Sequence, residues 1–410
     1  MEQTSFKVYG YRWIVLLVFM LVVAINQLLW ITFAPITGSA AAYYGVSDLS
    51  IGLLSMIFMI VYIIISIPAS WIIDTYGVRV AVGTGAVLTG IFGLLRGLAA
   101  PDYTMVLIAQ IGIAIGQPFV LNALTTVAAR WFPIQERATA TGLGTLAMYL
   151  GIFVGLVLTP YLTIHSNISG MLITYGTVSV IIAVIFFVFV RERPPTAPCL
   201  PEQEERSLAL DGLRDIVRRK DFILLLVIFF VGLGVFNAVT TWIEDIVRPR
   251  GFSIVQAGKI GGLMIVGGII GAIVIPLLSD HYRRRTPFLL LSVTGAILGL
   301  VGVTYITSYC PLLASAFIFG FFLLSAGPVG FQYGAEVTYP TAEGTSNGLL
   351  LLMGQISGIA FIIGMDSFKS RETGSMTLPL LALTGLLVVC VFLVARLREG
   401  IVLKKGNDKS

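Results

Sequence analysis

The chain has 410 residues, of which 57% are hydrophobic and only 11% charged, and its mean hydropathy is +0.95. Soluble domains carry about 25% charged residues, so this composition excludes a soluble globular protein and indicates one that lies in a lipid bilayer. The net charge of +5 does not indicate nucleic-acid binding, because the basic residues stand at the ends of apolar segments and form no continuous stripe.

Apolar segments long enough to cross a bilayer recur along the whole chain. A spanning helix needs about 20 apolar residues, and twelve segments meet this requirement: 12–36, 50–73, 80–99, 103–129, 138–162, 170–190, 221–246, 256–279, 286–308, 311–334, 345–366 and 375–396. Glycine-rich runs such as GGLMIVGGIIGAI (261–273) are typical of faces where two membrane helices approach closely. The sequence therefore predicts an all-α integral membrane protein with twelve transmembrane helices.

The first span contains polar residues in an otherwise apolar run. Asn26 and Trp30 are four positions apart and Gln27 and Trp30 three, so all three share one broad face of a helix. Polar groups inside a membrane face the bundle interior or a cavity. This favours a substrate pathway along that face, with Trp30 offering its ring to a cation. The alternative is that the amides join helices by hydrogen bonds and the indole fills core volume.

The loop after the second span has a counterpart half a chain later. IPASWIIDTYGVRV (67–80) and IPLLSDHYRRRTP (275–287) each place an aspartate and then arginine after Ile-Pro. The two aspartates, Asp74 and Asp280, are 206 positions apart. Parallel repeats of six spans are a transporter architecture. Asp74 has two possible partners, Arg79 in its own loop and Arg137 after the fourth span, and a pair between helices would favour one of two global states.

Polar side chains also lie in three later spans: Gln117 in the fourth, Tyr149 in the fifth and Gln355 in the eleventh. Each alone is more often structural than ligand-binding. We expect no Arg, Lys, His or carboxylate in the middle of a span. This disfavours dicarboxylate and phosphate-ester substrates and leaves few carriers for a proton, so uniport is the expected mode.

The segment at 191–220 is a long polar stretch between the sixth and seventh spans. Its first half is Pro-rich, which disfavours helix, and its second half, 206–220, has the spacing of an amphipathic surface helix. It separates an N-terminal six-helix bundle at 1–190 from a C-terminal one at 221–410. The two bundles are expected to be pseudo-symmetric.

The seventh span carries a second polar face. Asn237, Thr241 and Glu244 follow at spacings of four and three, which places them together on a helix. Glu244 is the candidate for coupling transport to protons or for attracting cations. The alternative for Glu244 is an interfacial salt bridge with Arg248, four positions further along.

Basic residues predict how the chain lies in the membrane. With the N-terminus in the cytoplasm, 20 of the 26 Lys and Arg residues fall on cytoplasmic segments and six on the other side. This asymmetry follows the positive-inside rule. We expect a multi-pass protein of the plasma (cytoplasmic) membrane with both termini in the cytoplasm.

Two loop motifs carry a family resemblance. DTYGVR (74–79) after the second span and RWFPIQERATATGL (130–143) after the fourth resemble loop signatures of the major facilitator superfamily. The resemblance implies two six-helix bundles with alternating access to a central site. It also implies loops that lock the outward-open state, in which Asp74, Arg79, Arg137 and Asp280 would act as gating residues. The leading Gly of the signature is absent here, and the second copy lacks the Gly after Asp280.

A second resemblance covers much of the chain. NQLLWITFAPI (26–36), WIIDTYGVR (71–79) and EVTYPTAEGTSNGLL (336–350) are similar to the feline leukaemia virus subgroup C receptor family. Members of that family are facilitators linked to choline and related amines, with earlier claims of haem. The compact chain with short termini fits a prokaryotic member.

The second resemblance also implies roles for single residues. Trp30 matches a family tryptophan implicated in binding the quaternary ammonium, and Gln355 matches a family glutamine. Tyr149 stands where the family has a glutamine and Leu233 where it has a tyrosine, so the pocket departs from the family at two positions. Tyr149 can still add an aromatic wall to a cation cage.

The sequence therefore predicts a secondary transporter for a small organic solute, most simply an amine or quaternary ammonium such as choline moved by facilitated uniport. The alternatives are a proton-coupled symporter of a monocarboxylate or amino acid, and a membrane receptor without transport. The sequence has no nucleotide-binding Gly loop with Lys, no metal cluster and no nucleophile–His arrangement that would indicate an enzyme. We expect a monomer whose partners are the substrate and the bilayer, without nucleic acid, cofactor or metal.

Overall fold

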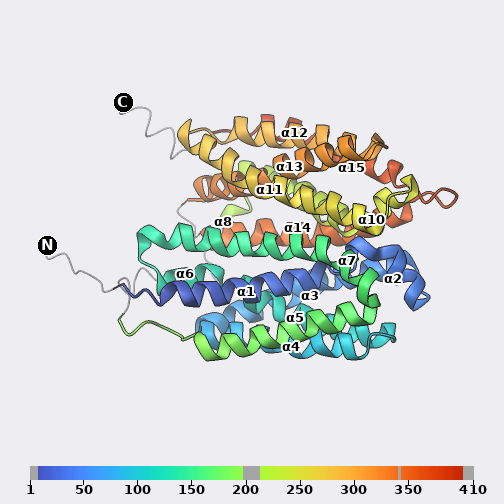
Figure 1. The fold of residues 1–410 in the computed structure, drawn as a ribbon. Coiled ribbons are helices and arrows are strands. Elements are labelled where there is room, and N and C mark those ends of the chain that lie inside the picture. The colour runs from blue at the N-terminus through green and yellow to red at the C-terminus, as the bar shows by residue number, and fades with distance from the viewer. Residues whose placement is uncertain (1–7, 197–212, 340–342, 400–410) are drawn as a thin grey trace. The chain divides into compact units, whose positions relative to one another are not determined.

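A computed structural model describes residues 8–196, 213–339 and 343–399, and all the regular structure within those ranges is helical. The N-terminal part holds α1 (Arg12–Ile31), η1 (Ala34–Ile36), α2 (Thr37–Tyr44), α3 (Asp48–Tyr76), α4 (Val78–Leu98), α5 (Tyr103–Leu121), α6 (Leu124–Trp131) and α7 (Ile134–Phe189). The C-terminal part holds α8 (Leu213–Ile216), α9 (Lys220–Thr241), α10 (Ile243–Val247), η3 (Arg248–Arg250), α11 (Ile254–His281), α12 (Thr286–Tyr305), α13 (Tyr309–Thr338), α14 (Glu343–Ser367) and α15 (Thr377–Ala395) (Figure 1).

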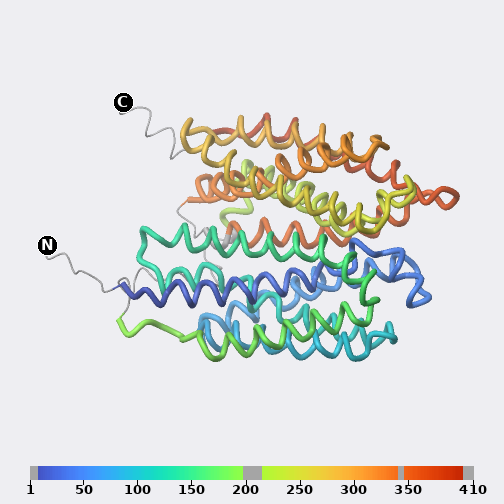
Figure 2. Tube along the Cα trace, viewed as in Figure 1, coloured from blue at the N-terminus to red at the C-terminus, as the bar shows by residue number. Residues whose placement is uncertain are grey.

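Eleven helical stretches in the described part of the chain are long and apolar enough to cross a membrane. One of them, α7, has 56 residues and contains two of the predicted spans. Its backbone leaves the helical region at Asn167, with φ 57° and ψ 177°, and Figure 2 shows the tube turning back within this stretch. These angles lie in a region that is nearly restricted to glycine, and the Asn167 side chain accepts a hydrogen bond from the amide of Gly170 at 3.0 Å. With this turn counted, the structure agrees with twelve spans.

Three predicted segments need correction. The first span is α-helical from Arg12 to Ile31 and then continues through η1, which contains Pro35, into α2, so the apolar helical stretch reaches Tyr44 rather than ending at 36. The helix of the seventh span ends at Thr241 rather than 246, and the chain restarts as α10. Of the amphipathic helix predicted at 206–220, residues 206–212 lie outside the described ranges. The described remainder forms the short α8, a turn and the start of α9.

Contacts between residues divide the chain into two compact units. Unit 1 comprises residues 1–32, 60–155 and 161–208. Unit 2 comprises 33–59, 156–160 and 209–410. The units therefore do not follow chain order alone, since 33–59 precede the linker and group with the segments that follow it.

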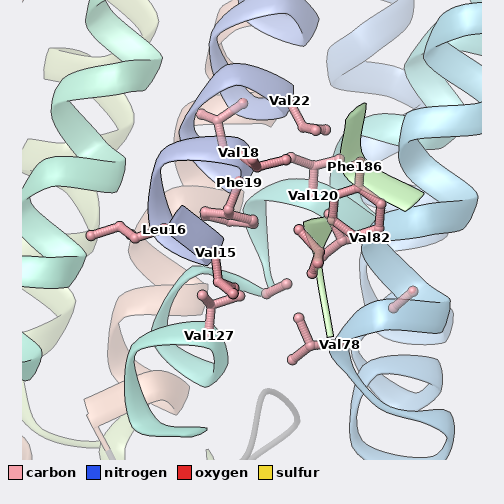
Figure 3. Packing of buried hydrophobic residues seen from close by; sticks show 14 of the residues in the cluster. Val15, Leu16, Val18, Phe19, Val22, Val78, Val82, Val120, Val127 and Phe186 are labelled. Atoms are coloured by element: carbon pink, nitrogen blue, oxygen red, sulfur yellow. The ribbon is translucent and has the colours of Figure 1, made fainter. Parts of the chain in front are cut away.

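Unit 1 has a core of small and branched apolar side chains. Valines from α1, α4, α5 and α6 converge there with Phe19 and Phe186 (Figure 3). Glycines bring its helices close together. An added Cβ at Gly151 of α7 would collide with the carbonyl oxygen of Ala24 on α1, and one at Gly176 would lie 2.5 Å from the carbonyl oxygen of Gly93 on α4. Such close backbone approach is the usual way membrane helices associate.

Unit 2 is built around the crossing of α11 and α13. Added Cβ atoms at Gly267 and Gly271 of α11 would collide with the carbonyl oxygens of Phe317 and Phe321 on α13. The glycine run predicted as a helix–helix contact face is thereby confirmed. α12 also packs on α13, and α9 packs on α14.

Candidate functional site

The polar face of α1 lies along α4. Asn26 is fully buried and donates from Nδ2 to the hydroxyl of Thr89 at 3.2 Å. Gln27, also buried, donates in turn to Oδ1 of Asn26 at 3.4 Å. The amide of Asn26 thus makes the inter-helix hydrogen bond that sequence reasoning offered as an alternative to ligand binding, and it orients Gln27.

The contact between α1 and α4 continues for two more turns. Gly93 lies one turn beyond Thr89, and an added Cβ there would lie 3.4 Å from Cδ1 of Leu29. Arg96 follows and donates from Nη1 to the carbonyl oxygen of Leu29 at 3.1 Å and from Nη2 to the hydroxyl of Thr32 at 3.4 Å. Residue numbers rise together on both helices, so α1 and α4 run parallel. Thr89, Gly93 and Arg96 form one face of α4, because their spacings are four and three.

The remaining site candidates fall in different units. Trp30 and Gln117 are buried in unit 1, where each is 6% exposed, and Tyr149 is half-buried there. In unit 2, Asn237 of α9 donates to the carbonyl oxygen of Gly354 at 3.1 Å, directly before Gln355 on α14. Asn237 is therefore held against the helix that carries Gln355.

A charged cluster occupies one end of unit 2. Glu244 of α10 is 3% exposed and accepts from the backbone amide of Gly38 on α2 at 3.0 Å. It also pairs with Arg248 at 3.2 Å, which confirms the interfacial salt bridge proposed from the i,i+4 spacing. An added Cβ at Gly38 would overlap the guanidinium of Arg248, so only glycine lets this side chain lie against α2.

Two further acids and a lysine complete the cluster. Asp48, at the start of α3, accepts from Arg248 at 2.7 Å and from Lys369 at 2.7 Å. Asp245 is fully buried and pairs with Lys369 at 3.1 Å and with Arg248. The cluster joins segments from before and after the linker, all within unit 2. Moving α2 and the start of α3 away from α10 would break several of these bonds together.

Burial sets the electrostatics of Glu244. It raises the pKa of this carboxyl, against the attraction of Arg248 and the hydrogen bond from Gly38, while the neighbouring Asp245 and Asp48 act in the same direction as burial. Burial likewise raises the pKa of Asp245. Glu244 is therefore a buried carboxyl that pairs with Arg248 and whose burial favours the protonated form relative to an exposed carboxyl.

One of the predicted gating residues, Arg79, contacts a glutamate that sequence reasoning missed. Glu192, just beyond α7, accepts from the amides of Val78 and Arg79 at 3.0 and 2.7 Å and pairs with Arg130 of α6. The Arg79 side chain bonds to the carbonyl oxygen of Phe187 at 3.4 Å. Arg137 donates to the carbonyl oxygens of Phe132 and Ala129 at 3.4 and 3.1 Å. The pairing predicted for Asp74 remains an expectation.

Unit 2 holds the counterpart. Asp280 pairs with Arg285, which also pairs with Glu336 of α13 at 3.0 Å. Glu399, just beyond α15, accepts from the amides of Arg285 and Thr286 at 3.0 and 3.2 Å. Each unit thus has a glutamate at the N-terminus of a helix, where orphan amides and the helix dipole favour an anion.

Known proteins resemble this chain both in sequence and in fold. A family model described as Major Facilitator Superfamily matches residues 15–362. Solute carrier family 49 member A3 of Xenopus tropicalis is 31% identical, over 88% of this chain and 79% of that protein. The choline/ethanolamine transporter flvcr2b of Danio rerio is 29% identical, over 95% of this chain and 82% of that protein. A solved structure of a bacterial homologue of the human lysosomal transporter Spinster, inward-facing and unoccupied, has a TM-score of 0.71 at 16% identity, covering 95% of this chain and 96% of its own. That likeness shows the fold.

Proposed function

This chain belongs to the major facilitator superfamily and is a multi-pass membrane transporter, and we propose that it moves a small amine or quaternary ammonium such as choline by facilitated uniport. The observation that supports this proposal is that Trp30 is buried and lies one helical turn from the hydrogen-bonded amides of Asn26 and Gln27. A desolvated indole attracts a cation without needing a counter-charge. Relatives of about 30% identity include a protein named as a choline/ethanolamine transporter, which supports the same substrate class.

In this proposal the remaining candidates divide the substrate contacts. Trp30 and Tyr149 supply aromatic faces for the cation. Gln27 and Gln117 in unit 1, and Asn237 and Gln355 in unit 2, supply amides for a hydroxyl or amine on the substrate.

The proposal also assigns the gates and the orientation. Asp74, Arg79 and Arg137 serve one gate and Asp280 its counterpart, as their repeated loops suggest. The protein acts as a monomer in the plasma membrane with both termini in the cytoplasm, an orientation that the charge asymmetry supports. Epitope tags at each end, probed before and after permeabilising the cell, test this orientation.

Ligand-dependent thermal unfolding of the purified protein tests the substrate class. The panel contains choline, ethanolamine, betaine, lactate and several amino acids, each at two pH values. We expect choline or ethanolamine to raise the melting temperature, and Trp30→Ala to weaken binding about tenfold, in line with a desolvated cation–π contact. Trp71→Ala is the matched control, because Trp71 is 51% exposed on α3. A shift with acids alone would reject the amine proposal.

One observation favours a second function, proton-coupled symport of a monocarboxylate or amino acid. Glu244 is buried, and burial raises its pKa. A carboxyl that exchanges its proton during a conformational change could couple that change to a proton gradient. Uptake into proteoliposomes with and without an imposed pH gradient separates the two functions. Symport predicts gradient-driven accumulation that Glu244→Gln abolishes, whereas uniport predicts equilibration unaffected by the gradient.

Stability against pH gives an independent check on Glu244. Because its pKa is raised in the folded protein, this group favours folding below its ordinary pKa of 4.5 and loses that contribution as pH rises through the raised value. Lowering the pH from about 7.5 to about 5.5 should therefore stabilise the wild type relative to Glu244→Gln. Asp245, Asp48, Arg248 and Lys369 face the group in both proteins, so their titration cancels to first order. Glu372→Gln, on an exposed residue after α14, should show no such pH-dependent difference.

A further inference from the structure

Arg96 is a charged side chain with no exposed surface. Burying a guanidinium is costly unless its donors are hydrogen-bonded. Its hydrogen-bond acceptors include three neutral groups: the carbonyl oxygen of Leu29 at 3.1 Å, Oε1 of Gln110 at 2.8 Å and the hydroxyl of Thr32 at 3.4 Å. Two of these three acceptors belong to the end of α1. The guanidinium of Arg96 therefore binds the C-terminal end of α1.

The C-terminal end of α1 favours a positively charged group beside it. α1 ends at Ile31, and the last carbonyl groups of a helix lack intrahelical donors and carry partial negative charge. Thr32 also donates from its hydroxyl to the carbonyl oxygen of Leu28 at 2.9 Å, so it links the last turn of α1 to Arg96. Gln110 of α5 holds the guanidinium from the other side. The end of α1 is thus tied to both α4 and α5.

Trp30 lies between the two residues of the α1 end that Arg96 binds. Leu29 precedes it and Thr32 follows it by two positions, so the backbone that carries the indole is fixed on both sides. We propose that Arg96 is a positioning residue for Trp30, holding the indole in the orientation that receives the substrate cation. This inference rests on the proposed function for the meaning of that orientation, but the positioning itself can be measured without any ligand.

The experiment uses the full-length protein labelled with 5-fluorotryptophan and observed by fluorine NMR. The chain has five tryptophans, so single Trp→Phe variants assign the signals. Arg96→Lys keeps the charge but cannot reach both Leu29 and Thr32 with one planar group. We expect this variant to shift or broaden the Trp30 signal and leave that of Trp131 unchanged. Trp131 is the matched control, because it is 3% exposed in the same unit.

Choline binding by the same variants gives the second measurement. We expect Arg96→Lys to weaken choline binding several-fold, and to have much less effect in a Trp30→Phe background, because residues acting through one contact are non-additive. An altered Trp30 signal in a protein that binds no choline would uphold the positioning and reject the substrate. An unchanged Trp30 signal, or equal changes in all five signals, would overturn the positioning.

A milder variant covers the case in which Arg96→Lys does not fold. Thr32→Val keeps the shape of the side chain and removes one acceptor of the guanidinium. We expect it to move the Trp30 signal in the same sense by a smaller amount. If the folded Thr32→Val protein leaves that signal in place, the proposal fails as well.

Discussion

The N-terminus of α4 in unit 1 and that of α12 in unit 2 are held in the same way by different residues. Glu192 binds the first amides of α4, and Glu399 binds those of α12. The sequence separations are also the same, 114 and 113 positions in each unit. The repeat therefore preserves a carboxylate cap that closes each six-span half, although that cap is not part of the repeated Asp–Arg motif.

The backbone and the charges around the two caps differ. Gly77, three positions after Asp74, has φ +94°, and an added Cβ there would collide with the Glu192 carboxylate. Arg283, three positions after Asp280, takes φ 52° without being glycine. Arg79 is exposed, whereas the buried Arg285 pairs with Asp280 and Glu336. Three positions after the aspartate, unit 1 therefore has a glycine that leaves room for the capping carboxylate, and unit 2 has an arginine; near the cap, unit 2 also has a buried arginine that binds two carboxylates.

The largest difference between the units should follow from removing that buried arginine. Arg285→Met leaves Glu336, itself 9% exposed, without its cation, and breaking one partner of a buried pair costs about 3–5 kcal/mol. Thermal unfolding in detergent measures the loss. The exposed Arg79→Met in unit 1 should change the melting temperature little. Adding Glu336→Leu to Arg285→Met should recover most of the stability, and an absence of recovery would mean that the pair is not the cause.

Three positions after the repeated aspartate, a glycine should matter in unit 1, whereas unit 2 needs none there. Gly77→Ala places a Cβ against Glu192 in a backbone region that is almost restricted to glycine, with a strain of about 1–3 kcal/mol. Arg283→Ala, at a position that already carries a side chain, is the matched control and should cost far less. Equal losses in melting temperature for the two variants would mean that unit 1 does not need a glycine at position 77.

Each carboxylate cap should stabilise the helix whose first amides it binds. Glu192→Gln and Glu399→Gln each replace a charged acceptor at a helix N-terminus, and loss of a cap costs about 1 kcal/mol. Glu192→Gln should cost somewhat more, because Arg130 loses its partner as well. Hydrogen exchange of the first turns of α4 and α12 reports each cap locally. If only one of the two helices lost protection, the two caps would have the same geometry but would not stabilise their helices equally.

The sequence predicts the membrane class and the twelve spans because each depends on local composition and length. It also predicts the Glu244–Arg248 pair, whose i,i+4 spacing is local. Glu192, Glu399 and the Asp48–Lys369 pair depend on contacts between segments more than 100 positions apart, and no local pattern marks them. Arg96 stands near a helix end in the sequence, where solvation is the usual outcome, and only the acceptors on α1 reveal why it is buried.

The smallest expected effect tests the backbone of unit 2 directly. Arg283 has a positive φ that costs a non-glycine residue about 1 kcal/mol. Arg283→Gly removes this strain but gives the unfolded chain more freedom, so the net gain should be at most about 0.5–1 kcal/mol. The melting temperature should therefore stay constant or rise slightly, in contrast to the loss expected for Gly77→Ala. A clear fall would mean that the Arg283 side chain contributes more to unit 2 than its backbone strain costs.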